Sequence, residues 1–137
     1  GRTMPDVNLQ YAMAVIVLDG GRLTFEATHS YERLSAPDVV RLMDRVTLRG
    51  DESLGDREAQ RPATVKVKLS DGRQVEQHVP AVRGTADNPM AKHEIEAKEM
   101  DLLAGVLGND KARATVDAIW GLDVTVPVAS LRPLLQL

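Results

Sequence analysis

The chain has 137 residues, of which 43% are hydrophobic, 27% charged and 3% aromatic, with a formal net charge of -3, three histidines and no cysteine. This size predicts one soluble domain, and the lack of cysteine excludes disulfide frameworks, thiolate zinc sites and cysteine nucleophiles. Lys and Arg are scattered along a mildly acidic chain, which argues against nucleic-acid binding because that normally needs a clustered basic face.

A solid apolar run covers residues 11–18. It is far shorter than the roughly 20 residues of a membrane-spanning helix, and residues 1–10 lack the basic start and long apolar core of a signal peptide. We therefore expect no membrane insertion and a cytoplasmic location.

Asn8 can cap a helix that contains this apolar run, and Gly20-Gly21 tolerates the left-handed conformation that ends a helix. A buried strand is the alternative, but the length, the Ala and Met content and both caps favour a buried helix.

A second helix is predicted from Ser35, which forms a capping-box-like start with Asp38, to about Arg45. Its apolar residues repeat at helical spacing, and they are Val39, Val40, Leu42, Met43 and Val46. An alternating pattern that begins at Val46 and Leu48 predicts one strand. The almost wholly polar residues 50–61 predict an exposed loop.

The next segment alternates apolar and polar residues around a tight turn that ends at Gly72, which predicts a β-hairpin. A two-residue loop would place Val67 opposite Glu76 and mix apolar and polar side chains on one face. A three-residue loop with Gly72 left-handed places Val67 opposite Val75 and Lys66 opposite Glu76. The apolar pattern therefore selects the three-residue loop.

Helical segments follow the hairpin. Asn88-Pro89 predicts a cap followed by a first-turn proline, Gly108 ends this helix, and another begins directly after it and ends near Trp120. A short apolar face, limited by Pro133, closes the chain with Leu131, Leu134 and Leu135. The predicted class is α+β: a small antiparallel sheet, made of the hairpin plus one strand, packed with about five helices in a single domain over 1–137.

Two residues are candidates for chemistry. Tyr11 lies in the first turn of the apolar helix, where the positive dipole end favours negative charge. A phenol there can bind a carboxylate or act as an acid or base if a pocket faces it, whereas the structural alternative is packing plus one hydrogen bond. His29 lies in the link after this helix, and its near-neutral titration suits proton transfer. No metal site is expected, because neither a second His nor a carboxylate stands at metal-ligand spacing.

The other features have structural alternatives. His78 on the polar face of the hairpin and His93 in a first helical turn are expected to be solvated. Arg83-Gly84-Thr85 can hold an anion or form the turn between strand and helix. Lys98 can pair with Glu94 one turn earlier, or extend along an interface. The chain has no nucleophile elbow, phosphate loop, dinucleotide fingerprint or zinc motif.

Several short strings, in this order and spacing, resemble the MmgE/PrpD family, also called the 2-methylcitrate dehydratase family. They are Met-Pro-Asp-Val-Asn-Leu-Gln-Tyr at 4–11, Ala-Met-Ala-Val-Ile-Val-Leu-Asp-Gly at 12–20, Val-Arg-Gly-Thr-Ala-Asp-Asn-Pro-Met at 82–90, Ile-Glu-Ala-Lys at 95–98, Leu-Leu at 102–103 and Leu-Arg-Pro-Leu-Leu at 131–135. The resemblance implies the smaller α+β lid domain and tail of a two-domain enzyme, whose larger helical domain is not among these residues.

The resemblance also implies a function. In this family the two domains enclose a site for small di- or tricarboxylates, and the reactions include dehydration of 2-methylcitrate, decarboxylation of cis-aconitate and epimerisation of iminodisuccinate, all without metal or organic cofactor. The lid contributes a tyrosine at the start of its first helix, which Tyr11 matches and which other members replace by His. Most catalytic His, Lys and Asp residues belong to the helical domain, so this chain is expected to be inactive alone. It is then either a truncated piece, which the start at Gly1-Arg2 directly before a family motif favours, or a separately encoded half.

The alternative function is a non-enzymatic interaction domain that docks a partner through the apolar first helix and the tail. A lid needs the Tyr11 phenol at a concave mouth, whereas a docking module would bury it in a flat interface. A lid without its larger domain leaves apolar surface uncovered on the tail, residues 126–137, so we expect a homodimer. Glu99 stands where many family members have an apolar or aromatic residue, a departure that bears on the packing of its helix.

Overall fold

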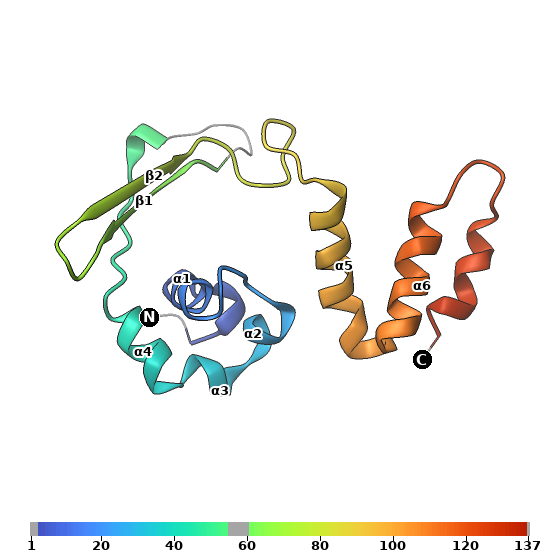
Figure 1. The fold of residues 1–137 in the computed structure, drawn as a ribbon, viewed down its shortest axis with the longest axis horizontal. Helices are drawn as coiled ribbons and strands as arrows, with labels where there is room; N and C mark the ends of the chain where they lie inside the picture. The colour runs from blue at the N-terminus through green and yellow to red at the C-terminus, as the bar shows by residue number, and fades with distance from the viewer. Residues whose placement is uncertain (1–2, 55–60, 137) are drawn as a thin grey trace. The chain divides into compact units, whose positions relative to one another are not determined.

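The structure is a computed structural model that describes residues 3–54 and 61–136. The chain divides into two compact units, one formed by Gly1–Arg49 with Lys98–Leu137 and the other by Gly50–Ala97. Figure 1 shows helices and a two-stranded antiparallel sheet, which confirms the predicted α+β class. The single domain over 1–137 stays a prediction, and each unit is described by itself.

The first unit begins with a short 3-10 helix, η1 (Pro5–Val7), followed by the apolar helix α1 (Leu9–Leu18). The Asn8 side chain accepts a hydrogen bond from the Tyr11 N–H at 3.0 Å, as expected of an N-cap. Beyond α1 the chain turns through Gly20-Gly21, whose φ angles of 79° and 89° suit glycine. The predicted helix and both of its end signals are confirmed.

Helix α4 (Pro37–Met43) packs against α1, and Figure 1 shows α2, α3 and α4 curving around α1. The side chain of Gln10 on α1 donates to the Val46 carbonyl at 2.7 Å, just beyond the end of α4. Removing apolar side chains from water is the main stabilising term in such a cluster. The buried residues of the core are Tyr11, Ala14, Val15, Ala27 and Val39, with Leu34, Ala36, Leu42 and Met43 packed against them.

Two short helices that were not predicted connect α1 to α4. These are α2 (Phe25–His29), capped by Thr24, and α3 (Tyr31–Leu34), capped by Ser30. His29 therefore ends a helix and does not lie in an irregular link. Four or five residues are too few to show helical periodicity, so only the capping residues signalled these helices.

The predicted start of the second helix is wrong. Ser35 ends α3, Ala36 precedes the first residue of α4, and Pro37 occupies the first turn, where its missing N–H leaves no hydrogen bond unmade. The carboxylate of Asp38 binds the Arg33 side chain and does not form a capping box.

The second unit contains η2 (Glu52–Leu54) and the hairpin of β1 (Ala63–Lys68) and β2 (Gln74–Val79). Val67 pairs with Val75, and Lys66 pairs with Glu76, whose carboxylate lies 3.0 Å from the Lys66 ammonium. The φ angle of Gly72 is 88°, in the left-handed region. The predicted register and three-residue loop are confirmed.

The additional strand predicted from Val46 is not formed, so the sheet of the described residues has two strands. The Val46 N–H donates to Met43 O at 3.0 Å, and its carbonyl accepts from Gln10. These bonds use the backbone groups that a strand ladder needs. Of the polar loop predicted over 50–61, residues 55–60 lie outside the described residues.

Helix α5 (Lys92–Leu107) begins later than predicted. Asn88 does not cap it, because its Oδ1 accepts from Arg83 at 2.7 Å while its amide N–H donates to Ala81 O at 2.9 Å. Glu94 instead accepts the Ala91 N–H at 2.8 Å, directly before the helix. The predicted end at Gly108 is confirmed, with a φ of 78°.

Helix α6 (Asn109–Trp120) follows at once, and the 3-10 helix η3 (Val128–Leu134) packs against it. Glu99 of α5 accepts the Trp120 indole N–H at 3.0 Å. The polar residue at this position thus gains a specific partner on the neighbouring helix.

Candidate functional site

The Tyr11 side chain is buried in the α1 core. Its exposed fraction is 0%, and its hydroxyl donates to the Ala27 carbonyl of α2 at 2.6 Å. Burial raises the pKa of the phenol; Arg33 opposes the rise and Asp19 adds to it. The group is therefore a neutral hydrogen-bond donor whose acceptor is already in place.

This geometry matches the structural alternative for Tyr11, which is packing plus one buried hydrogen bond. A carboxylate can reach the hydroxyl only after the Ala27 carbonyl moves away. The catalytic role of Tyr11 stays a prediction, and it requires a rearrangement of α2.

His29 lies on the exposed side of α2. Its Nδ1 is 2.9 Å from the Phe25 carbonyl oxygen and 2.9 Å from Thr28 Oγ1, and the ring lies over Phe25 with centroids 4.1 Å apart. A carbonyl oxygen can only accept, so we assign the proton of the neutral ring to Nδ1. Nε2 then carries the lone pair of a base.

The Tyr11 hydroxyl therefore binds one side of the five-residue helix α2, and the His29 side chain extends from another side of the same helix. Ala27, which holds the phenol, is buried, whereas His29 is exposed. Residues two apart on a helix do not face each other. The arrangement does not by itself make an acid and base pair around one substrate.

A hollow of about 500 Å3 lies next to Ala27. Arg33 in its wall binds Asp19 at 2.6 Å and Asp38 at 3.0 Å, which raises the pKa of Arg33 and lowers that of Asp38. Because three carboxylates line the hollow and its guanidinium is already paired, it does not suit a di- or tricarboxylate. The lining residues are Asp19, Thr24, Glu26, Ala27, Ser30, Glu32, Arg33 and Ala36.

The Arg33 pairs were missed at the sequence level. Asp19 lies fourteen residues away and Asp38 five, and neither separation is a helical neighbour spacing. The three side chains meet because α3 turns the chain back between α1 and α4.

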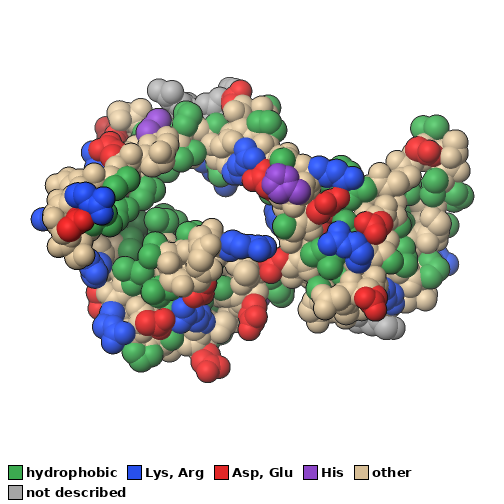
Figure 2. Space-filling view, viewed as in Figure 1, with side chains coloured by type: hydrophobic (Ala, Val, Ile, Leu, Met, Phe, Trp, Pro, Cys, Tyr) green, Lys and Arg blue, Asp and Glu red, His purple; other side chains and the backbone are tan. Residues whose placement is uncertain are grey.

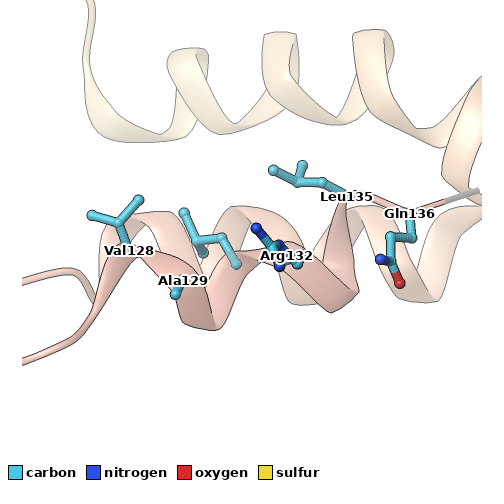
Figure 3. A pocket seen from close by; sticks show the side chains of 6 residues that line it. Val128, Ala129, Arg132, Leu135 and Gln136 are labelled. Atoms are coloured by element: carbon cyan, nitrogen blue, oxygen red, sulfur yellow. The ribbon is translucent and has the colours of Figure 1, made fainter.

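A second hollow, of about 400 Å3, lies on the tail and is drawn in Figure 3. Its walls are mainly apolar with one guanidinium, so it offers neither an acid nor a base for proton transfer. The residues that line it are Val128, Ala129, Leu131, Arg132, Leu135 and Gln136.

The Arg83 segment forms a turn. Arg83 binds the Glu94 carboxylate with two hydrogen bonds and donates to Asn88 Oδ1 at 2.7 Å, and the following Gly84 has a φ of 97°. Arg83 and the Ala91 N–H together lower the pKa of Glu94. The predicted Lys98 to Glu94 pair is wrong, because Glu94 binds Arg83. An anion site at Arg83 would first have to displace this carboxylate.

The remaining candidates are surface groups. His78 and His93 are exposed, as predicted, and His78 Nδ1 lies 2.9 Å from Thr64 Oγ1 on the neighbouring strand. On the face shown in Figure 2, Lys and Arg side chains are interspersed with Asp and Glu. Within residues 3–54 and 61–136, no group of three potential ligands is placed to hold a metal ion. In the same residues, no helix combines the length and apolar character needed to cross a membrane.

The chain matches a known protein family. A family model described as the MmgE/PrpD C-terminal domain matches residues 2–123, which include helices α1 to α6 and the hairpin and end before η3. A comparison with curated proteins gives no match.

Proposed function

The chain belongs to the MmgE/PrpD family, and we propose that it is the lid portion of a lyase-type enzyme that acts on small di- or tricarboxylates. The reaction class is dehydration, decarboxylation or epimerisation, by proton transfer next to a carboxylate and without metal or organic cofactor. The observation that carries the proposal is the family match, which extends over α1 and includes Tyr11.

Proton transfer next to a carboxylate needs an acid, a base and positive groups that hold the substrate. In the part of the chain that the structure describes, the hollow beside α2 is acidic and the Tyr11 hydroxyl is bound to a carbonyl. We therefore expect the substrate-binding cations and most acid and base groups to come from the family's helical domain. Each missing acid or base forfeits about 10²–10⁴-fold in rate, so the chain alone should be inactive.

Within this proposal Tyr11 is the hydrogen-bond or proton donor of the lid, and it acts once the Ala27 carbonyl has been displaced. His29 is the second candidate, as a base through Nε2, because its Nδ1 is bound to a carbonyl oxygen. His29 belongs to α2 and the Tyr11 hydroxyl is bound to it, so one movement of α2 would move His29 and release the Tyr11 hydroxyl.

A non-enzymatic interaction domain is the second candidate function. The tail favours it, because Val128 and Leu135 are 73% and 56% exposed and lie beyond the matched residues 2–123. Apolar groups gathered on one surface often mark a contact site. In this proposal the tail docks a partner chain or a second copy of this chain, which would give a homodimer.

The proposal is tested with the natural polypeptide that carries these residues. It is incubated with 2-methylcitrate, cis-aconitate or iminodisuccinate in the presence of EDTA, and the products are followed by NMR. We expect turnover of at least one acid by this polypeptide and none by the 137-residue chain. Turnover that disappears with EDTA would contradict the cofactor-free mechanism, and equal turnover by the isolated chain would contradict the lid assignment.

A further inference from the structure

One backbone carbonyl covers the only buried phenol among the described residues. The Tyr11 hydroxyl donates to Ala27 O at 2.6 Å, and Ala27 also lines the hollow of about 500 Å3. The other tyrosine, Tyr31, is 61% exposed. Access to Tyr11 from this hollow therefore depends on where α2 lies.

Helix α2 packs against η1 and is mostly exposed. It has five residues, of which only Ala27 is buried, and its first residue, Phe25, is 44% exposed. The polar bonds that hold its start are the Thr24 cap on the Ala27 N–H, at 3.2 Å, and a bond from the Phe25 N–H to Asp101, at 2.7 Å. Segments with few buried contacts and exposed hydrogen bonds open locally at low free energy.

Two glycines lie in the loop between α1 and α2. Gly20 and Gly21 have φ angles in the left-handed region, and no heavy atom lies within 4 Å of a Cβ built on either residue. Helices α1 and α4 are in direct contact with each other, and both contribute buried residues to the core. Movement of α2 can therefore leave this part of the core in place.

We propose that α2 is a displaceable cover whose local opening, with α1 and α4 still packed, exposes the Tyr11 phenol. In the covered state the Ala27 carbonyl holds the hydroxyl, and in the open state the hydroxyl is free to bind another acceptor. The inference concerns access to Tyr11 and stands whether or not the proposed lyase activity is found.

Nitration by tetranitromethane tests the cover, because the reagent must reach the phenolate in order to react with it. Peptide mass spectrometry reports Tyr11 and Tyr31 separately, and the chain has no cysteine to compete for the reagent. In the wild-type chain we expect rapid modification of Tyr31 and slow modification of Tyr11. Thr24→Ala removes the α2 cap without touching the phenol, and loss of an N-cap changes a helix equilibrium about fivefold, so Tyr11 should react about fivefold faster.

Two variants serve as controls. Thr24→Ser keeps a capping hydroxyl and should restore the wild-type rate. Ser30→Ala removes the equivalent cap from α3, where Ser30 accepts the Arg33 N–H at 3.0 Å, and should leave the Tyr11 rate unchanged. An equal increase of the Tyr11 rate in Thr24→Ala and Ser30→Ala would overturn the proposal, because general loosening would then explain the modification. A Tyr11 rate that stays at the wild-type value in Thr24→Ala would overturn it as well.

The wild-type chain gives an independent test. Local opening exposes little surface, so the Tyr11 nitration rate should be nearly independent of low urea concentrations that do not unfold the chain. A rate that rises with urea as steeply as the global unfolding equilibrium would show that Tyr11 is exposed only by complete unfolding. That result would overturn the proposal even if Thr24→Ala failed to fold.

Discussion

The buried hydroxyl of Tyr11 should make a measurable contribution to stability, and Tyr11→Phe isolates it. The substitution keeps the packed ring and removes only the hydroxyl that donates to Ala27 O at 2.6 Å. Tyr31→Phe is the matched control, because Tyr31 is 61% exposed.

The size of the effect depends on what remains at the Ala27 carbonyl. A buried hydrogen bond contributes about 0.5–1.5 kcal/mol, and a buried acceptor left without any partner costs about 1–3 kcal/mol. The Ala27 oxygen also accepts a long bond from the Ser30 N–H, at 3.4 Å, so it keeps a weak partner. We therefore expect a loss of about 1 kcal/mol for Tyr11→Phe and close to none for Tyr31→Phe.

Urea unfolding followed by far-ultraviolet circular dichroism measures this loss as a lower midpoint with an unchanged slope. Because burial raises the pKa of Tyr11, its contribution is complete below the usual value of about 10 and is lost as pH rises toward the folded-state value. The difference between wild type and Tyr11→Phe should shrink above about pH 10. Equal midpoints for the two Phe variants at pH 7 would refute the structural role assigned to this hydroxyl.

Three further outcomes are expected. Gly72→Ala should lower the free energy of unfolding by about 1–2 kcal/mol, because the φ of Gly72 is 88°. Gly105→Ala, in the exposed interior of α5, should raise the free energy of unfolding by about 0.5–1 kcal/mol. Urea unfolding measures both changes, and destabilisation by Gly105→Ala would contradict the comparison. Long-range nitrogen NMR of neutral His29 should show the proton on Nδ1, and a proton on Nε2 would show that the Phe25 carbonyl does not control the ring. Sedimentation should find the wild-type chain dimeric at tens of micromolar and Val128→Glu/Leu135→Glu monomeric, and a monomeric wild type would rule out association through the tail.

The elements that the sequence predicted correctly have local and redundant signals. Helix α1 has an apolar run, a cap at Asn8 that marks its start and glycines that mark its end. The hairpin register followed from matching Val67 with Val75, because a one-residue slip would send every side chain to the wrong face.

The boundaries that were wrong depend on competing partners. Asp38 and Asn88 both carry acceptors suited to a helix start, but in the folded chain Arg33 binds the Asp38 carboxylate and Arg83 binds Asn88 Oδ1. The alternating pattern at Val46 predicted a strand, yet the last turn of α4 and the Gln10 side chain take its backbone groups. Such partners lie outside the window in which a local pattern is interpreted.

The candidate site was predictable as residues but not as an arrangement. Sequence position placed Tyr11 in the first turn of α1 and suggested packing or substrate binding as its role. Only the fold shows that α2, a helix too short to be predicted, supplies the carbonyl that binds the phenol. The same helix fixes the ring of His29 through the Phe25 carbonyl.

The most direct test of the lid assignment is the kcat/KM of the natural polypeptide and of its Tyr11→Phe and Tyr31→Phe variants, measured on the same carboxylic acid. Removing a general acid lowers the rate by about 10²–10⁴-fold, so Tyr11→Phe should fall in that range while Tyr31→Phe keeps the wild-type value. The variant proteins must show the same helical circular dichroism as wild type, so that unfolding does not account for a loss. An active polypeptide whose kcat/KM is unchanged by Tyr11→Phe would contradict the role proposed for Tyr11 in this lid.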